Sequence, residues 1–159
     1  MKNTTPPKSK KPSYSFLFVA ALLAIAMNSY AGDAIYTGLL SNKALSGYDP
    51  VAYFTEDKPV KGKKEWQWEY KGADWYFSSA ENLELFKLNP EKYAPQYGGF
   101  CAWAVAAKHD RAPGDPKYWK IVDDKLYLNY DKSVQEKWQQ DIPGFIEEAN
   151  RYWPTLLAE

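Results

Sequence analysis

The stretch EWQWEYKGADWYF (residues 65–77) carries the clearest structural signal in this sequence. Up to Tyr70 its aromatic residues alternate with glutamate and glutamine, which is the two-residue period of a strand with one face in the core. A tight connection follows at residues 71–74, and the strand pattern resumes at residues 75–77. The stretch therefore predicts a β-hairpin.

Helices are predicted directly after this hairpin. Ser78 is expected to cap a helix, with Glu81 closing a capping box, and an Asn-Pro pair ends that helix. A second short helix is expected at residues 90–97. A double glycine then breaks the chain, and residues 100–107 are typical of a short, almost wholly apolar helix.

A second hairpin is predicted at residues 118–130, after which Asp131 caps another helix and a last helix opens at Ile142. Upstream of the first hairpin, residues 47–50 are typical of a turn, and residues 51–54 of a short strand or a loop. No internal repeat is evident in the residue letters. The expected architecture is α+β, with two β-hairpins packed against several short helices and with helices at the C-terminal end.

The first 31 residues have the three parts of a secretory signal peptide. Lysines precede an apolar run at residues 16–27, and Ser29-Tyr30-Ala31 presents small residues where a signal peptidase cleaves. Twelve apolar residues reach about 18 Å as a helix, which is short of the ~30 Å hydrocarbon core. Cleavage near Ala31 is expected to leave a domain of residues 32–159, without a membrane anchor, in the periplasm or outside a bacterial cell.

Charge and cysteine content restrict the function of that domain. Four of the 20 basic residues lie in the leader, so residues 32–159 carry 16 basic against 20 acidic side chains. This balance argues against a nucleic-acid partner, which calls for a basic face. The chain has one cysteine, Cys101, and therefore no internal disulfide.

Three stretches form a pattern that goes beyond secondary structure. They are GYDPVAYF (residues 47–54), YKGADWYFSSAENLELFKLNPEKYAPQYGGFCAWAVA (residues 70–106) and GDPKYWKIVDDKLYLNYDKSVQEKW (residues 114–138). This pattern resembles the YHS-domain family, and within it the exported bacterial branch. The resemblance implies a YHS-like fold over nearly all of residues 32–159.

The chain departs from this family at the metal-binding positions. Metal-associated relatives carry cysteines in the segments D-P-V-C-G and F-C-S-x-x-C, whereas Ala52, Ser78 and Asn82 stand at or near those positions here. Thiolates select soft metal ions, so losing three of them removes that ligand set. The resemblance therefore implies the fold without this metal site, and a copper or zinc ion held by other residues stays open as a cofactor.

Cys101 is the candidate catalytic residue. It follows a double glycine near the start of the expected helix, where backbone N–H groups and the helix dipole lower the pKa of a thiol and favour the thiolate. Its neighbours Phe100, Ala102 and Trp103 are apolar, and a buried cysteine among them would keep a neutral thiol. The apolar setting slightly favours the second interpretation.

Five further residues are candidates for ligand binding: Tyr48, Asp49, Tyr53, His109 and Arg111. Tyr48, Asp49 and Tyr53 resemble the opening motif of the family, although Asp49 before a proline is also a typical turn residue. His109 is the only histidine, and with Cys101 it could form a thiolate–imidazole pair or two ligands of one metal ion. An exposed loop histidine is the more common case. Arg111 could form part of a polar rim near Cys101.

Three functions follow from these residues, and enzymatic activity stays open. The first is a periplasmic module that binds an unknown small ligand or a metal ion without catalysis. The second is a thiol-based redox protein that uses Cys101. The third is a structural or interaction domain in which Cys101 is buried. A single histidine and a single cysteine make a hydrolytic triad hard to assemble.

Overall fold

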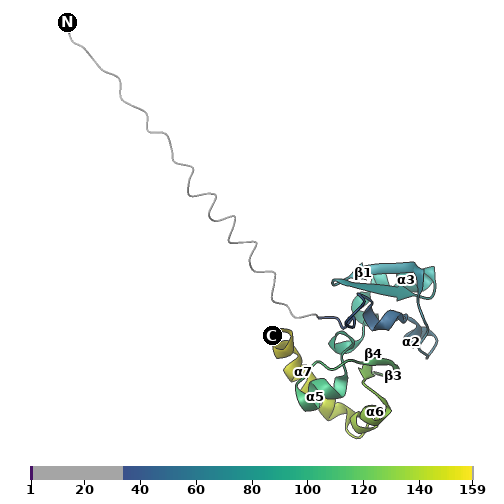
Figure 1. The fold of residues 1–159 in the computed structure, drawn as a ribbon, viewed down its shortest axis with the longest axis vertical. Coiled ribbons are helices and arrows are strands. Elements are labelled where there is room, and N and C mark those ends of the chain that lie inside the picture. The colour runs from purple at the N-terminus through teal and green to yellow at the C-terminus, as the bar shows by residue number, and fades with distance from the viewer. Residues whose placement is uncertain (2–33, 159) are drawn as a thin grey trace. The chain divides into compact units, whose positions relative to one another are not determined.

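The computed structural model describes Met1 and residues 34–158 of the chain (Figure 1). Apart from Met1, the predicted signal peptide at residues 1–31 lies outside the described residues. Among the residues that are described, no helix has the length and apolar character needed to cross a membrane. The elements are η2 (Ala44–Gly47), α2 (Ala52–Thr55), β1 (Lys63–Tyr70), β2 (Ala73–Phe77), α3 (Ala80–Leu88), α4 (Pro90–Tyr93), η3 (Gln96–Gly99), α5 (Ala102–Lys108), β3 (Asp115–Val122), β4 (Lys125–Asn129), α6 (Lys132–Trp138) and α7 (Ile142–Ala158), where η marks a 3₁₀ helix.

The first predicted hairpin is confirmed as the antiparallel pair β1–β2. Along β1 the tryptophans and Tyr70 are half-buried and the residues between them are exposed, as the alternation predicts. On β2, Trp75 and Phe77 are fully buried, and α3 covers them through Phe86. The Phe86 ring centre lies 4.9 Å from that of Trp75 and 5.2 Å from that of Phe77. This aromatic cluster forms the core at one end of the fold.

The second hairpin, β3–β4, is also confirmed, and α5, α6 and α7 gather beside it at the green-to-yellow end of the fold (Figure 1). Asp131 caps α6 as predicted, because its carboxylate accepts a hydrogen bond of 2.8 Å from the Val134 N–H. The core at this end packs Tyr127 and Trp138 against residues of α5 and α7. With two hairpins and surrounding helices, the fold is α+β as expected.

Local details differ from the sequence prediction at four places, the first being the helix expected at residues 90–97, which ends at Tyr93. Residues 51–54 are neither strand nor loop, because α2 begins at Ala52. The cap of α3 is Ser79 and not Ser78, since the Ser79 hydroxyl accepts from the Asn82 N–H at 3.2 Å. The helix expected at residues 100–107 begins two residues later, because Phe100 and Cys101 have extended backbone angles.

The two hairpins belong to two copies of one structural unit, a repeat of the backbone that the residue letters do not show. β1 begins at Lys63 and β3 begins at Asp115, an offset of 52 residues. The same offset relates β2 to β4 and the helix cap Ser79 to the helix cap Asp131. Both hairpins also carry an irregularity directly after their first pair.

The correspondence extends upstream of the hairpins. Each 3₁₀ turn contains two successive left-handed residues, which are Leu45 and Ser46 in η2 and Tyr97 and Gly98 in η3. The Asp49 N–H donates to the Val60 carbonyl at 2.8 Å, and the Cys101 N–H donates to the Ala112 carbonyl at 2.9 Å, again 52 residues on. We refer to residues 44–86 as the first repeat and to residues 96–138 as the second repeat.

A third apolar cluster joins the two repeats. It contains Leu45 and Tyr53 from the first repeat and Leu126 and Leu128 from the second. The Tyr53 hydroxyl also donates a hydrogen bond of 2.8 Å to the carbonyl of Pro116. Burying these side chains between the repeats holds the second hairpin against α2 and η2, and this junction positions the candidate site.

Candidate functional site

A pocket of about 620 Å³ opens at the junction of the two repeats. Residues from η2, from the start of β3 and from the end of β4 line it together with the N-terminal segment. The lining residues are Tyr36, Ser46, Tyr48, Pro113, Gly114, Asp115, Pro116, Lys117, Tyr118, Tyr130 and Asp131. Four of these are tyrosines, and Tyr130 is among the most exposed large side chains of the described residues. The pocket thus combines aromatic walls with a few charged groups.

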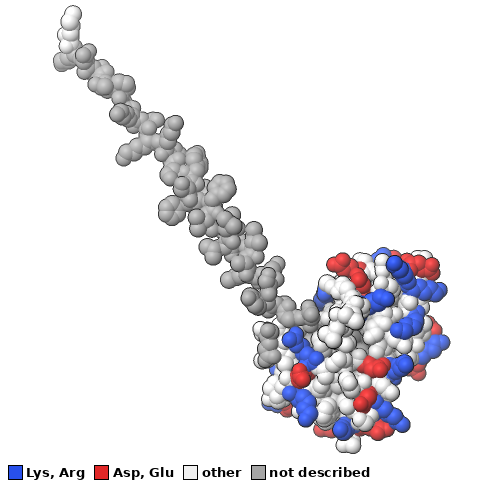
Figure 2. All heavy atoms as spheres, in the orientation of Figure 1, with Lys and Arg blue, Asp and Glu red and all other residues white. Residues whose placement is uncertain are grey.

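Two carboxylates and one ammonium group line this pocket. The Asp115 carboxylate accepts from the Lys117 N–H at 2.8 Å, which holds it at the start of β3. Hydrogen bonds from the Val134 N–H and from Ser133 lower the pKa of Asp131, so this side chain is ionised at neutral pH. Charges of both signs are mixed over the visible face of the described residues (Figure 2).

Tyr48, one of the predicted binding residues, lines this pocket, and its ring already faces a cation. The Lys61 ammonium lies 3.9 Å from the centre of the Tyr48 ring and donates to the Ser46 carbonyl at 3.1 Å. Such an arrangement is a cation–π contact. The Tyr48 ring at the rim of the pocket therefore already contacts one positively charged group, the Lys61 ammonium.

Tyr53 lies behind the pocket wall. Its side chain is 1% exposed, its ring meets Trp119 edge-on, and its hydroxyl is bonded to the Pro116 carbonyl. Burial raises the pKa of Tyr53 far above its ordinary value, so the phenol stays protonated. Tyr53 supports the lining residue Pro116 and does not itself line the pocket.

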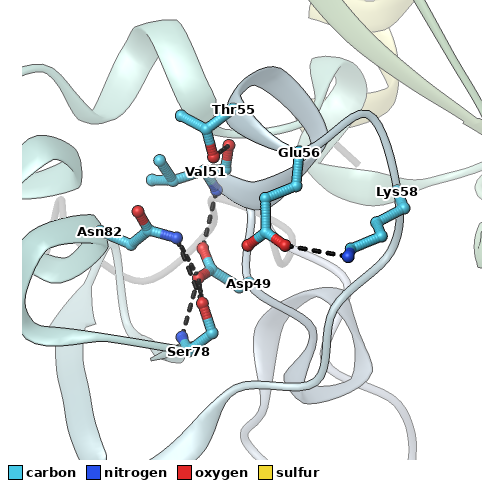
Figure 3. Close-up of polar contacts among 7 residues, drawn as sticks. All are labelled: Asp49, Val51, Thr55, Glu56, Lys58, Ser78 and Asn82. Carbon is cyan, nitrogen blue, oxygen red and sulfur yellow. Dashed lines mark hydrogen bonds and ion pairs between the residues drawn. The ribbon is translucent and has the colours of Figure 1, made fainter.

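Asp49 is fully buried at the centre of a hydrogen-bonded cluster (Figure 3). Its Oδ1 accepts from the N–H groups of Val51 at 2.9 Å and Ala52 at 3.4 Å. Its Oδ2 accepts from the Ser78 N–H at 2.8 Å, the Ser78 hydroxyl at 2.6 Å and the Asn82 amide at 2.7 Å. The carboxylate thereby starts α2 and ties it to the beginning of α3.

The positions at which metal-associated relatives would carry cysteine meet at this cluster. Ala52, Ser78 and Asn82 all donate to the Asp49 carboxylate, Ala52 through its backbone and the other two through side chains. No group of three or more histidine, cysteine, aspartate or glutamate residues within residues 34–158 could hold a metal ion. The described residues therefore do not fit copper or zinc.

Cys101 is fully buried at the N-terminal end of α5. Burial raises the pKa of its thiol, and this effect outweighs backbone hydrogen bonds from Ala104, Tyr130 and Trp103 that favour the thiolate. The sulfur lies 3.8 Å from Oδ1 of Asn129. The thiol is thus neutral at neutral pH. The backbone groups at the start of α5 favour the thiolate as expected, but burial has the larger effect on the pKa.

His109 and Arg111 lie at the other end of α5. His109 follows the last residue of the helix, so about eight residues at 1.5 Å rise separate it from Cys101, or roughly 12 Å. Its ring is exposed and stacks on Tyr152, with 3.4 Å between ring centres. The Arg111 N–H donates to Asp110. The structure therefore does not bring His109 to Cys101, and neither His109 nor Arg111 lines the pocket.

Sequence reasoning missed most of the pocket lining. Tyr36, Tyr118 and Tyr130 come from three separate segments, and no motif links them. The available signal was the placement of Tyr130 directly before the helix cap Asp131, where a large aromatic side chain is left exposed.

A family model described as YHS domain matches residues 51–97. The protein is a YHS domain-containing protein. The YHS match begins before α2 and ends inside η3, so it covers most of the first repeat and stops before α5. No curated protein and no solved structure gives a significant match to the chain. Apart from its first two residues, the second repeat thus lies outside the matched YHS segment, and every lining residue of the pocket lies before residue 51 or after residue 97.

Proposed function

We propose that this YHS domain-containing protein is an exported binding module, and that the tyrosine-lined pocket at the repeat junction is its ligand site. The observation that carries the proposal is the pocket itself, because about 620 Å³ falls within the ~300–1,000 Å³ range of small-molecule sites. Placement in the periplasm or outside the cell rests on the signal-like residues 1–31.

The chemistry of the lining favours a small organic cation. Aromatic faces attract ammonium groups, and Tyr48 already carries one, from Lys61, on its ring. Asp115 and Asp131 add two carboxylates to the same pocket, together with the ammonium of Lys117 and the Lys61 ammonium on the Tyr48 ring. A ligand with one positively charged nitrogen would therefore meet aromatic faces and two carboxylates.

Binding of two probes tests this proposal: tetramethylammonium for the cation and glucose for a neutral ring that also stacks on aromatic side chains. We expect saturable binding of tetramethylammonium by titration calorimetry or by NMR shifts. Tyr130→Ala should weaken it about 2- to 30-fold, because a cation–π contact contributes ~0.5–2 kcal/mol. Tyr152→Ala, which changes a tyrosine stacked on His109, is the matched control.

Charge is tested separately by Asp131→Asn. Asparagine keeps a helix cap as well as aspartate does, so α6 stays in place while the negative charge is removed. Weaker tetramethylammonium binding is expected from a variant that still folds, with a small loss of thermal stability because the ionised form of Asp131 is stabilised by its hydrogen bonds. Binding of glucose without tetramethylammonium would refute the cationic ligand, and failure of both probes to bind would refute the pocket as the ligand site.

A further inference from the structure

We propose that Cys101 is a site of oxidation to cysteine sulfinate by a hydroperoxide, and that the polar groups around it are arranged to hold the two oxygens of that anion. A comparison of the two repeats supports this assignment independently of the ligand that the pocket binds.

The first repeat shows what this part of the fold holds. Asp49 places its two carboxylate oxygens among the N–H groups of Val51, Ala52 and Ser78, at distances of 2.8 to 3.4 Å. The amide of Asn82 adds a donor from a side chain, at 2.7 Å. In the first repeat, these donors therefore surround a buried anion with two oxygens on one atom.

The second repeat offers the same backbone donors to a sulfur atom. The offset of 52 residues places Cys101 at the position of Asp49. The same offset turns Val51, Ala52 and Ser78 into Trp103, Ala104 and Tyr130, and the backbone groups of these three residues act to lower the pKa of the Cys101 thiol against the effect of burial. A group with one acceptor atom thus occupies a frame that holds two acceptor atoms in the first repeat.

The side-chain amide of Asn129 provides an independent observation, because one of its donors has no hydrogen-bond acceptor. The residue is fully buried, and its Oδ1 lies 3.8 Å from the sulfur while accepting from the Trp103 N–H at 3.4 Å. Its Nδ2 is buried and has no hydrogen-bond partner among the described residues. Buried amide groups are normally paired, so this free donor, on the amide whose Oδ1 lies 3.8 Å from the sulfur, points to an acceptor that the thiol does not provide. A sulfinate, which carries two oxygens on the atom bonded to Cβ as aspartate does, would provide it.

The oxidation balances with a hydroperoxide as the only oxidant. The Cys101 thiolate attacks one peroxide oxygen, the S–O bond forms as the O–O bond breaks, and the leaving oxygen takes a proton as water or an alcohol. Sulfur loses two electrons and the peroxide gains them. A second hydroperoxide converts the sulfenate to the sulfinate in the same way. The chain has no second cysteine, so the sulfenate has no internal thiol with which to form a disulfide.

Peroxide treatment of the purified protein tests the proposal. We expect mass spectrometry to find a product with two added oxygens at Cys101 while the near-ultraviolet circular dichroism stays that of the folded protein. Oxidation should be slow, because the thiol is buried and mostly neutral. In Asn129→Leu, the product should run on to three added oxygens, because the donor that holds the sulfinate is lost. A folded protein that leaves Cys101 unmodified would overturn the proposal.

A second variant tests the anion frame without peroxide. Cys101→Asp places a carboxylate where the sulfinate would lie, and we expect it to fold with a melting temperature at or above that of Cys101→Ser. Val105→Asp puts the same charge on the next turn of α5, where the side chain is fully buried in the apolar core, and should prevent folding. If Cys101→Asp fails to fold as Val105→Asp does, the frame does not hold a two-oxygen anion and the proposal is wrong.

Discussion

Replacing Asp49 with alanine should strongly destabilise the fold. The carboxylate is fully buried and accepts hydrogen bonds from α2, from the end of β2 and from α3. Asp49→Ala leaves at least three close donors without an acceptor, on Val51, Ser78 and Asn82. Each buried unpaired donor costs about 1–3 kcal/mol, and water entering the vacated space relieves part of that cost. We therefore expect a loss of about 3–5 kcal/mol in the free energy of unfolding.

Urea unfolding followed by tryptophan fluorescence measures this loss, since the chain has seven tryptophans. Asp110→Ala is the matched control, because that aspartate is exposed and accepts only from the adjacent Arg111 N–H. The control should remain within about 0.5 kcal/mol of the parent protein. A loss below about 1 kcal/mol for Asp49→Ala would refute the reasoning, since it would mean that the donors find other partners at little cost.

Three further predictions follow from local geometry. Gly62→Ala and Gly114→Ala should each lower the free energy of unfolding by about 1–3 kcal/mol in urea melts. A Cβ at residue 62 would lie 2.5 Å from the Tyr76 backbone, and a Cβ at residue 114 would lie 2.4 Å from the Gly99 carbonyl oxygen. Unchanged unfolding midpoints would contradict these contacts. Ser79→Ala should cost about 1 kcal/mol through loss of the α3 cap, and an equal stability of Ser79→Ala and the parent would show that Ser79 is not the cap. Asp131 has a lowered pKa in the folded protein, so its contribution to stability is complete above the ordinary aspartate pKa of about 4 and is lost as the pH falls through the lower folded value. Asp131→Ala should therefore flatten the acid limb of a curve of stability against pH. An unchanged acid limb would contradict the lowered pKa.

Both hairpins and the helix cap Asp131 could be predicted because their signals are local. The alternation in residues 65–70 records which side chains face the core, and a capping aspartate bonds within its own first turn. The region around Asp49 was harder, because α2 starts where a buried carboxylate is held by groups from β2 and α3. The residues next to Asp49 in the sequence give no information about Ser78 and Asn82, which bond to its carboxylate.

The repeat and the pocket were missed for a related reason. Few residues are identical between the repeats, Gly47 with Gly99 and Gly62 with Gly114 among them, while the backbone geometry is kept. A backbone conformation can be held by different side chains, so the correspondence is visible only in hydrogen bonds and turns. The pocket lies between segments that only the docking of the repeats brings together, and no single segment has the composition of a binding site.

The apolar cluster between the repeats has a consequence for how this chain can be divided. A piece that ended at residue 97, where the family match ends, would lose Leu126 and Leu128 and leave the Leu45 and Tyr53 side chains against water. It would also lose the Pro116 carbonyl that the Tyr53 hydroxyl needs. The matched segment, residues 51–97, is therefore smaller than the unit that can fold. Inserting it into another protein would require the second repeat to be included.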